Sequence, residues 1–180
     1  MRKLLVSGAG KDRPGIVAAL TQVLHEAGCN IEDTSMTRLE DHFAMLVIAL
    51  LPAGVALDVL EKRLGDAMAR FDLVLSLRPI DTERETIPPR GRGYSISVSG
   101  PDRTGIIFHV TRYLAGLEVN ILSLSSRRLT RASEAPVFLM MAEAEVPETL
   151  SDEALARGLS ELGASEGLDI RAERLDEYTL

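Results

Sequence analysis

Two short groups of residues occur twice in the chain with the same spacing, and their side chains are suited to binding a small zwitterion. The first group, Asp12-Arg13-Pro14-Gly15, recurs 90 residues later as Asp102-Arg103-Thr104-Gly105. The second group, Asn30-Ile31, recurs as Asn120-Ile121 at the same offset. Each first group precedes a predicted helix, whose N-terminal N–H groups favour a carboxylate. Each asparagine offers a donor and an acceptor, so the two groups together have what a free amino acid requires.

The same residues also have a purely structural interpretation. Asp12 and Asp102 can cap helices, Gly15 and Gly105 can ease packing, and the asparagines can fix turns. A structural motif retained after duplication would show the same repetition. The repeat by itself therefore leaves both interpretations open.

Side chains that support catalysis or metal binding are few and scattered. The three histidines, His25, His42 and His109, have no partner at metal-ligand spacing. The run Gly8-Ala9-Gly10-Lys11 lacks the spacing of a phosphate-binding loop, and no nucleophile has an evident base. The single cysteine, Cys29, excludes a C-x-x-C metal loop. We therefore predict no catalytic residues, no metal site and no cofactor.

The elements that must position the repeated groups follow one order in both copies. In the first copy, Asp12 is expected to cap a helix with Pro14 in its first turn. An apolar run at 3–8 is typical of a buried strand. The remaining predicted elements are strands at 30–39, 43–51 and 73–80 and a helix at 55–71. The order β-α-β-β-α-β predicts an α/β (α+β) fold of the ferredoxin-like kind, with two helices on one face of a four-stranded antiparallel sheet.

The repeat therefore predicts two domains, at residues 1–80 and 94–180, with a linker at 81–93 that holds little apolar material. Beyond residue 130 the offset becomes 95, which places five extra residues near Thr130–Ala135 in the second copy. A hairpin loop would tolerate this insertion.

Exposed edge strands at 30–39 and 120–129 invite pairing with other strands. We expect the two copies to pair through these edges into one eight-stranded sheet. Chains are then expected to form a homodimer through their remaining apolar helix faces.

Composition and charge exclude several classes of protein. The chain is 46% hydrophobic and carries a net charge of −7. Residues 94–180 hold 8 basic and 14 acidic side chains, which argues against direct nucleic-acid binding. The first strand lacks the aromatic residues of an RNA-recognition sheet. No segment reaches the length of about 18 apolar residues that crosses a membrane, and one cysteine favours a reducing compartment, so we expect a cytoplasmic protein.

The repeated groups resemble the pattern of the ACT domain family, in which Asp-Arg-Pro-Gly-Ile is followed by Asn-Ile. The run Gly28-Cys29-Asn30-Ile31-Glu32-Asp33 further resembles the glycine cleavage system transcriptional repressor proteins, which are stand-alone tandem ACT proteins. In this family the ligand binds where the first loop of one unit faces the edge strand of its neighbour. The residues that the resemblance assigns to ligand binding are Asp12, Arg13, Gly15, Asn30, Ile31, Asp102, Arg103, Gly105, Asn120 and Ile121.

The resemblance implies a non-enzymatic regulatory protein that senses an amino acid, with glycine among the candidates. It implies a transcriptional co-regulator of the glycine cleavage system that acts through a DNA-binding regulator protein. Two alternatives stay open, a regulatory subunit of an amino-acid biosynthetic enzyme and an interaction protein that binds no ligand. Thr104 replaces the proline at Pro14, so the two sites are expected to differ.

Overall fold

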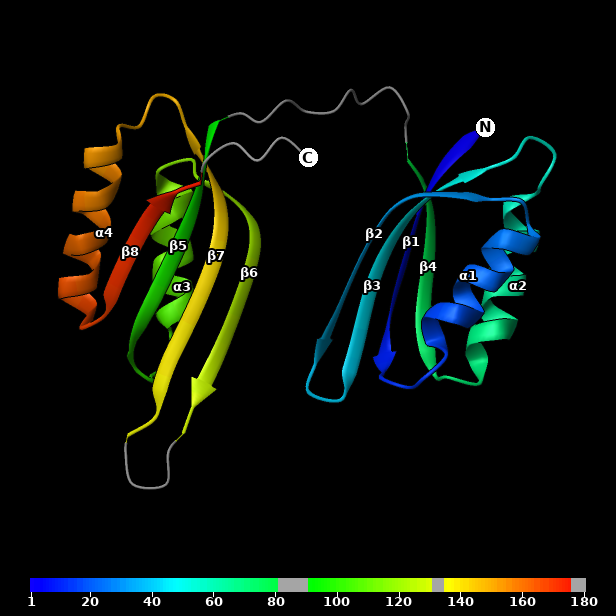
Figure 1. Cartoon of the computed structure of the whole chain (residues 1–180), viewed down its shortest axis with the longest axis horizontal. Coiled ribbons are helices and arrows are strands. Elements are labelled where there is room, and N and C mark those ends of the chain that lie inside the picture. Colours follow the sequence, from blue (N-terminus) through cyan, green and yellow to red (C-terminus); the bar gives the residue numbers. More distant parts are fainter. Residues whose placement is uncertain (81–90, 131–134, 176–180) are drawn as a thin grey trace. The chain divides into compact units, whose positions relative to one another are not determined.

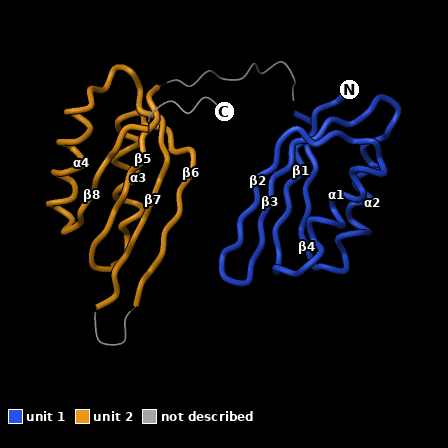
Figure 2. Tube along the Cα trace, viewed as in Figure 1, with its two compact units in different colours: residues 1–85 blue, residues 86–180 orange. Residues whose placement is uncertain are grey.

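The chain divides into two compact units, residues 1–85 (unit 1) and 86–180 (unit 2), as Figure 2 shows. The computed structural model describes residues 1–80, 91–130 and 135–175. The elements of unit 1 are β1 (Arg2–Lys11), α1 (Ile16–Glu26), β2 (Asn30–Leu39), β3 (His42–Leu51), α2 (Leu57–Ala69) and β4 (Leu73–Ile80). Those of unit 2 are β5 (Gly91–Pro101), α3 (Ile106–Gly116), β6 (Asn120–Leu129), β7 (Val137–Pro147), α4 (Asp152–Glu166) and β8 (Asp169–Arg174).

Each unit contains one four-stranded sheet in which all neighbouring strands are antiparallel. The strand order is β2-β3-β1-β4 in unit 1 and β6-β7-β5-β8 in unit 2. In each unit the two helices cover one face of the sheet (Figure 1). The predicted fold, two ferredoxin-like β-α-β-β-α-β units, is therefore confirmed.

The cores form because apolar residues alternate along the strands and recur with helical spacing. In unit 1, Leu4 and Val6 of β1 are buried with Leu20 of α1 and Leu64 of α2. The first helix presents its apolar stripe as predicted, with Ile16, Ala19, Leu20, Val23 and Leu24 buried. The second core repeats this arrangement with Ile96, Val98, Val110, Leu114, Leu155 and Leu159. Each unit thus encloses a core of its own.

The largest differences between the predicted and the observed strand boundaries occur in β1 and β5. β1 continues to Lys11, beyond the apolar run at 3–8, because all ten of its residues pair with β3. β5 begins at Gly91, within the range predicted as linker. The rest of the linker, and most of the predicted insertion near Thr130–Ala135, lie outside the described residues.

The second strand of each unit lies at an edge of its sheet. All ten residues of β2 are exposed, because β2 is hydrogen-bonded to β3 alone in the sheet and none of the described helices covers it. β6 of unit 2 has the same place beside β7. An edge of this length presents unpaired backbone groups. The joining of the two edges into one eight-stranded sheet stays a prediction.

Candidate ligand-binding site

The loop between β1 and α1 presents an uncapped helix N-terminus. Gly15 occupies the N-cap position with φ +93°, in the left-handed region, and no side chain caps the helix. Gly105 repeats this before α3 with φ +94°. The expectation that Asp12 caps the helix, with Pro14 in its first turn, was therefore wrong. α1 begins only at Ile16, whose N–H donates to the Arg13 carbonyl at 3.5 Å, and no side chain caps the N–H groups that follow it.

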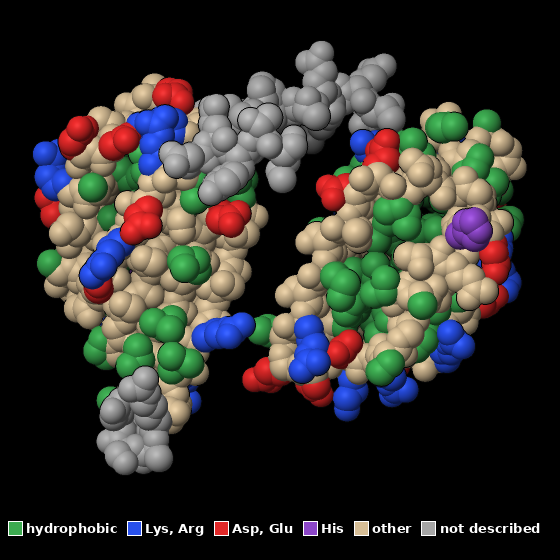
Figure 3. Space-filling view, viewed as in Figure 1, with side chains coloured by type: hydrophobic (Ala, Val, Ile, Leu, Met, Phe, Trp, Pro, Cys, Tyr) green, Lys and Arg blue, Asp and Glu red, His purple; other side chains and the backbone are tan. Residues whose placement is uncertain are grey.

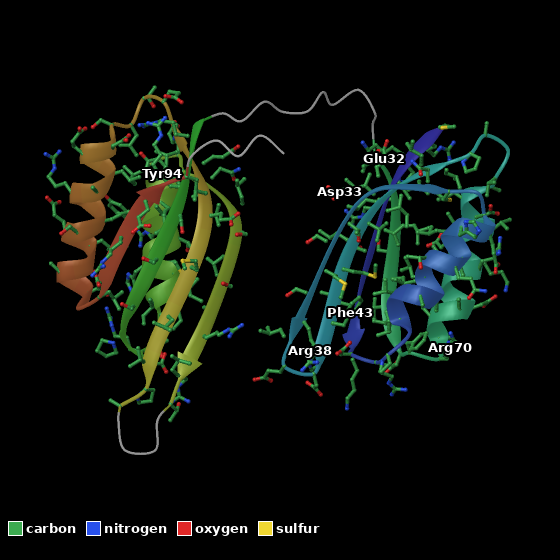
Figure 4. The ribbon with its side chains drawn as sticks, viewed as in Figure 1. Glu32, Asp33, Arg38, Phe43, Arg70 and Tyr94 are labelled. Atoms are coloured by element: carbon green, nitrogen blue, oxygen red, sulfur yellow. The ribbon has the colours of Figure 1, made fainter. Side chains whose placement is uncertain are left out.

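Both aspartates of the predicted site instead pair with an arginine of the edge strand. The Asp12 carboxylate lies 3.5 Å from the Arg38 guanidinium. In unit 2, Arg128 Nε donates to Asp102 Oδ2 at 2.7 Å. Figure 4 shows Arg38 at the end of β2 that lies beside this loop. These pairs tie each loop to the edge strand. The sequence contained the signal, since Arg38 and Arg128 repeat with the offset of 90, but sequence reasoning assigned them no role.

The asparagines lie at the other end of the sheet from the loop in their own unit. Asn30 pairs with Leu50, which is opposite Lys3 near the start of β1. The loop follows Lys11, at the far end of that strand. Eight residues of β-strand separate these positions by about 27 Å. One unit therefore does not bring Asp12–Gly15 and Asn30 together.

The same separation holds in unit 2. Asn120 begins β6 and its side-chain amide lies 3.4 Å from Glu145 Oε2. Ile31 and Ile121, the remaining pair of the predicted set, follow the asparagines at the start of each edge strand. A site that uses both the loop and the asparagine needs the edge strand of another ACT-type unit.

The two loops have different electrostatic surroundings. In unit 2, Arg103 donates to the backbone oxygen of Glu166 at 2.5 Å and also pairs with its carboxylate. The hydrogen bond from Arg103 to the Glu166 carboxylate, assisted by the electrostatic effect of His109 and Arg103, lowers the pKa of the Glu166 carboxyl from its ordinary value. The Nδ1 atom of His109 lies 3.6 Å from the same carboxylate. Arg103 is therefore largely neutralised.

In unit 1, no carboxylate occupies the corresponding position among the described residues that line the loop. Arg13, Pro14, Gly15, Arg70 and Phe71 line a shallow depression of about 480 Å³. The Arg70 guanidinium lies 4.7 Å from the centre of the Phe71 ring, close enough for a cation–π contact. Two guanidinium groups thus stand beside the uncapped N-terminus of α1, and this side of unit 1 is better suited to an anion. Sequence reasoning missed Arg70 and Glu166 because they break the repeat.

The described part of the chain has neither a metal cluster nor a membrane-spanning helix. No group of three or more His, Cys, Asp and Glu side chains is placed there to hold a metal ion. No helix among those residues is long and apolar enough to cross a membrane. His42 lies 2.9 Å from Asp41, its neighbour in sequence, and is not part of the loop geometry.

Comparisons with known proteins agree with this architecture. ACT domain models match residues 2–77 and 94–152. The glycine cleavage system transcriptional repressor of Escherichia coli is 29% identical over 69% of this chain, and the match spans 64% of the repressor's length. A crystal structure of an unknown protein from Galdieria sulphuraria is 30% identical, with a TM-score of 0.84, over 97% of this chain and 99% of that one.

A second crystal structure, of a protein provisionally described as a glycine cleavage system transcriptional repressor, has a TM-score of 0.73. It is 19% identical over 98% of both chains, so it supports the fold. The resemblance found in the sequence is confirmed. The chain belongs to the ACT domain family and consists of two ACT domains in tandem, related to the glycine cleavage repressor.

Proposed function

We propose that this protein is a non-catalytic regulatory protein that binds a free amino acid at its β1–α1 and β5–α3 loops. The observation that carries the proposal is the repeated geometry of these loops. Each has a left-handed glycine, an uncapped helix N-terminus and an Asp–Arg pair that ties the loop to an exposed edge strand. The helix N-terminus supplies donors for a carboxylate, and the aspartate and asparagine supply acceptors for an ammonium group.

A complete site would need the loop of one ACT domain and the edge strand of another ACT domain, because one unit does not bring its loop and its asparagine together. In an antiparallel pair, the start of one strand lies beside the end of the other. Asn30 or Asn120 at the start of one edge strand would then lie beside an Asp12–Gly15 or Asp102–Gly105 loop. The separation of loop and asparagine within each unit supports this division of the site.

The site that uses the Asp12–Gly15 loop binds more tightly than the one that uses Asp102–Gly105. Arg13 and Arg70 add positive potential beside the first loop, whereas Glu166 neutralises Arg103 beside the second. A carboxylate is attracted to the first and less to the second. The two sites therefore respond over different ranges of ligand concentration.

Thermal unfolding in the presence of each of the twenty amino acids tests ligand binding. We expect glycine or another small amino acid to raise the melting temperature. Asn30→Ala and Asn120→Ala should each weaken binding about ten- to a hundred-fold, because each removes a hydrogen bond to a charged group. Thr34→Ala, at an exposed position elsewhere on β2, is the matched control. Asparagine variants that unfold more easily yet bind normally would contradict the site.

The protein acts on transcription of the glycine cleavage system through a DNA-binding partner. The relation to the E. coli repressor supports this role, and so does the acid excess, with a net charge of −7. The purified protein should not bind duplex DNA tightly, since no excess of basic residues is available to neutralise phosphates. Salt-dependent, submicromolar binding of the purified protein to duplex DNA in a mobility-shift assay would refute this expectation. Recovery of a biosynthetic enzyme in place of a DNA-binding protein by affinity capture would favour a regulatory-subunit role.

A further inference from the structure

Each sheet has one face beneath the helices and an opposite face, here called the open face, that no helix of the described residues covers. Successive residues of a strand point to opposite faces, so Leu5, between the buried Leu4 and Val6, belongs to the open face of unit 1. The register of the strands assigns the other members. Figure 4 shows Asp33 on the side of the sheet away from α1 and α2.

The repeat allows the two open faces to be compared position by position. At five positions unit 1 has apolar residues where unit 2 has polar or charged ones, whereas Ser7 and Ser97 are alike and Lys3 stands where unit 2 has Gly93. The pairs, with unit 1 first, are Leu5 and Ser95, Ala9 and Ser99, Ile48 and Glu143, Leu50 and Glu145, and Val74 and Asp169. At these five positions the open face of unit 1 is the more apolar of the two.

The open face of unit 1 is both apolar and accessible. Val74 is 79% exposed and Leu46 is 50% exposed. A shallow depression of about 470 Å³ is lined by residues of all four strands and by none of the described helices; apolar Ala9, Leu46 and Val74 share its lining with Ser7, Ser35, Thr37 and Ser76. Figure 3 shows hydrophobic side chains gathered over the strands of unit 1. A contiguous apolar patch on a soluble domain marks an interaction site.

We propose that the open face of unit 1 binds the same face of a second copy of this chain, to form a two-fold symmetric dimer by sheet-on-sheet packing. The open face of unit 2 is a poor alternative, because burying Glu143, Asp169 and Arg171 against apolar side chains would desolvate charges. The first face spans four strands and the eight residues over which β1 pairs with β4. Strand geometry makes that about 500 Å² per copy, or about 1,000 Å² in all, which is the lower limit for a biological interface.

Charge complementarity fixes the direction of the two-fold axis. One row across the open face contains, in order, Asp33, Ile48, Leu5 and Arg78. An axis parallel to the strands places β2 opposite the partner's β4, and β3 opposite the partner's β1. Asp33 then faces the partner's Arg78, and Ile48 faces the partner's Leu5. Symmetry makes two such ion pairs at the rim and two apolar contacts at the centre.

The corresponding row of unit 2 does not match itself in this way. It contains Ser123, Glu143, Ser95 and Glu173. The same axis would place Glu173 opposite Ser123 of the other copy and bury Glu143 without a cation. Self-association is therefore specific to unit 1.

Sedimentation of the full chain tests the proposal with matched variants. Leu46→Asp places a charge in the centre of the open face, and Met141→Asp does so at the equivalent position of unit 2. We expect the wild type to be a dimer, Leu46→Asp to weaken dimerisation at least about a hundred-fold, and Met141→Asp to leave it unchanged. A wild type that is monomeric at about 100 µM, or equal effects of the two variants, would overturn the proposal.

A charge swap tests the axis with changes at exposed positions that preserve the apolar centre. Asp33→Arg and Arg78→Asp should each weaken dimerisation about ten-fold, because each turns two attractive contacts into repulsive ones. The double variant should restore wild-type affinity. Circular dichroism of each variant verifies that unit 1 is folded. If the double variant is as weak as the single ones, the proposed two-fold arrangement is wrong.

Discussion

Replacing Gly15 with alanine should destabilise unit 1, because its backbone lies in a region that side chains disfavour. Gly15 has φ +93°, and an L-residue in the left-handed region costs about 1–2 kcal/mol. Steric crowding adds little, since a Cβ atom there would lie 3.8 Å from Phe71 Cζ, an ordinary contact. We therefore expect a loss of about 1–2 kcal/mol in the free energy of unfolding. For a domain of this size that is a decrease of about 4–16 °C in melting temperature.

Gly65 provides a matched control in the same unit. It lies within α2, and a Cβ atom there would meet nothing within 4 Å. Gly65→Ala should stabilise unit 1 by about 0.5–1 kcal/mol, because alanine loses less backbone entropy in a helix. The same chemical change thus has opposite effects at the two glycines.

Urea unfolding followed by circular dichroism measures both effects, and hydrogen exchange assigns them to unit 1. Gly105→Ala is the equivalent change in unit 2 and should act on that unit alone. There, a Cβ atom would approach Cδ2 and Nε2 of His109 to 3.3 Å, so the His109 ring must also move. A Gly15→Ala variant as stable as wild type would show that the loop does not require its left-handed glycine. The geometry argued for the ligand site would then be wrong.

Two further predictions concern titrating side chains. Arg103 holds the pKa of Glu166 below its ordinary value of 4.5. Ionised Glu166 therefore stabilises unit 2 above pH 4.5. This contribution is lost as the pH falls through the folded-state pKa of Glu166. Glu166→Gln should therefore flatten the decrease in stability below pH 4.5, and an unchanged acid profile would contradict the role of Arg103. Burial raises the pKa of the Cys29 thiol. A disulfide reagent should therefore modify Cys29 of the folded protein more slowly than free cysteine at neutral pH, and at the rate of free cysteine in urea. If folded Cys29 and free cysteine react at equal rates, this prediction is wrong.

The architecture of each unit could be predicted from the sequence because it depends on short-range patterns. Alternating apolar residues, as in Phe43, Met45 and Val47, mark a strand with one buried face. Helical spacing of Leu20 and Leu24 marks the first helix. Duplication supplies each pattern twice, which made the order of elements clear. The ACT family resemblance depends on the same repeated residues.

The surroundings of the candidate site depended on tertiary structure. Asp12 pairs with Arg38 because β2 returns beside the loop, 26 residues later in the chain, and a local capping preference did not predict this. Asn30 lies far from that loop because β2 runs antiparallel to β3. The partner of Arg103 is Glu166, 63 residues away. Sequence spacing reports neighbours within a turn or a strand, whereas strand register and ion pairs join distant segments and exist only once the chain has folded.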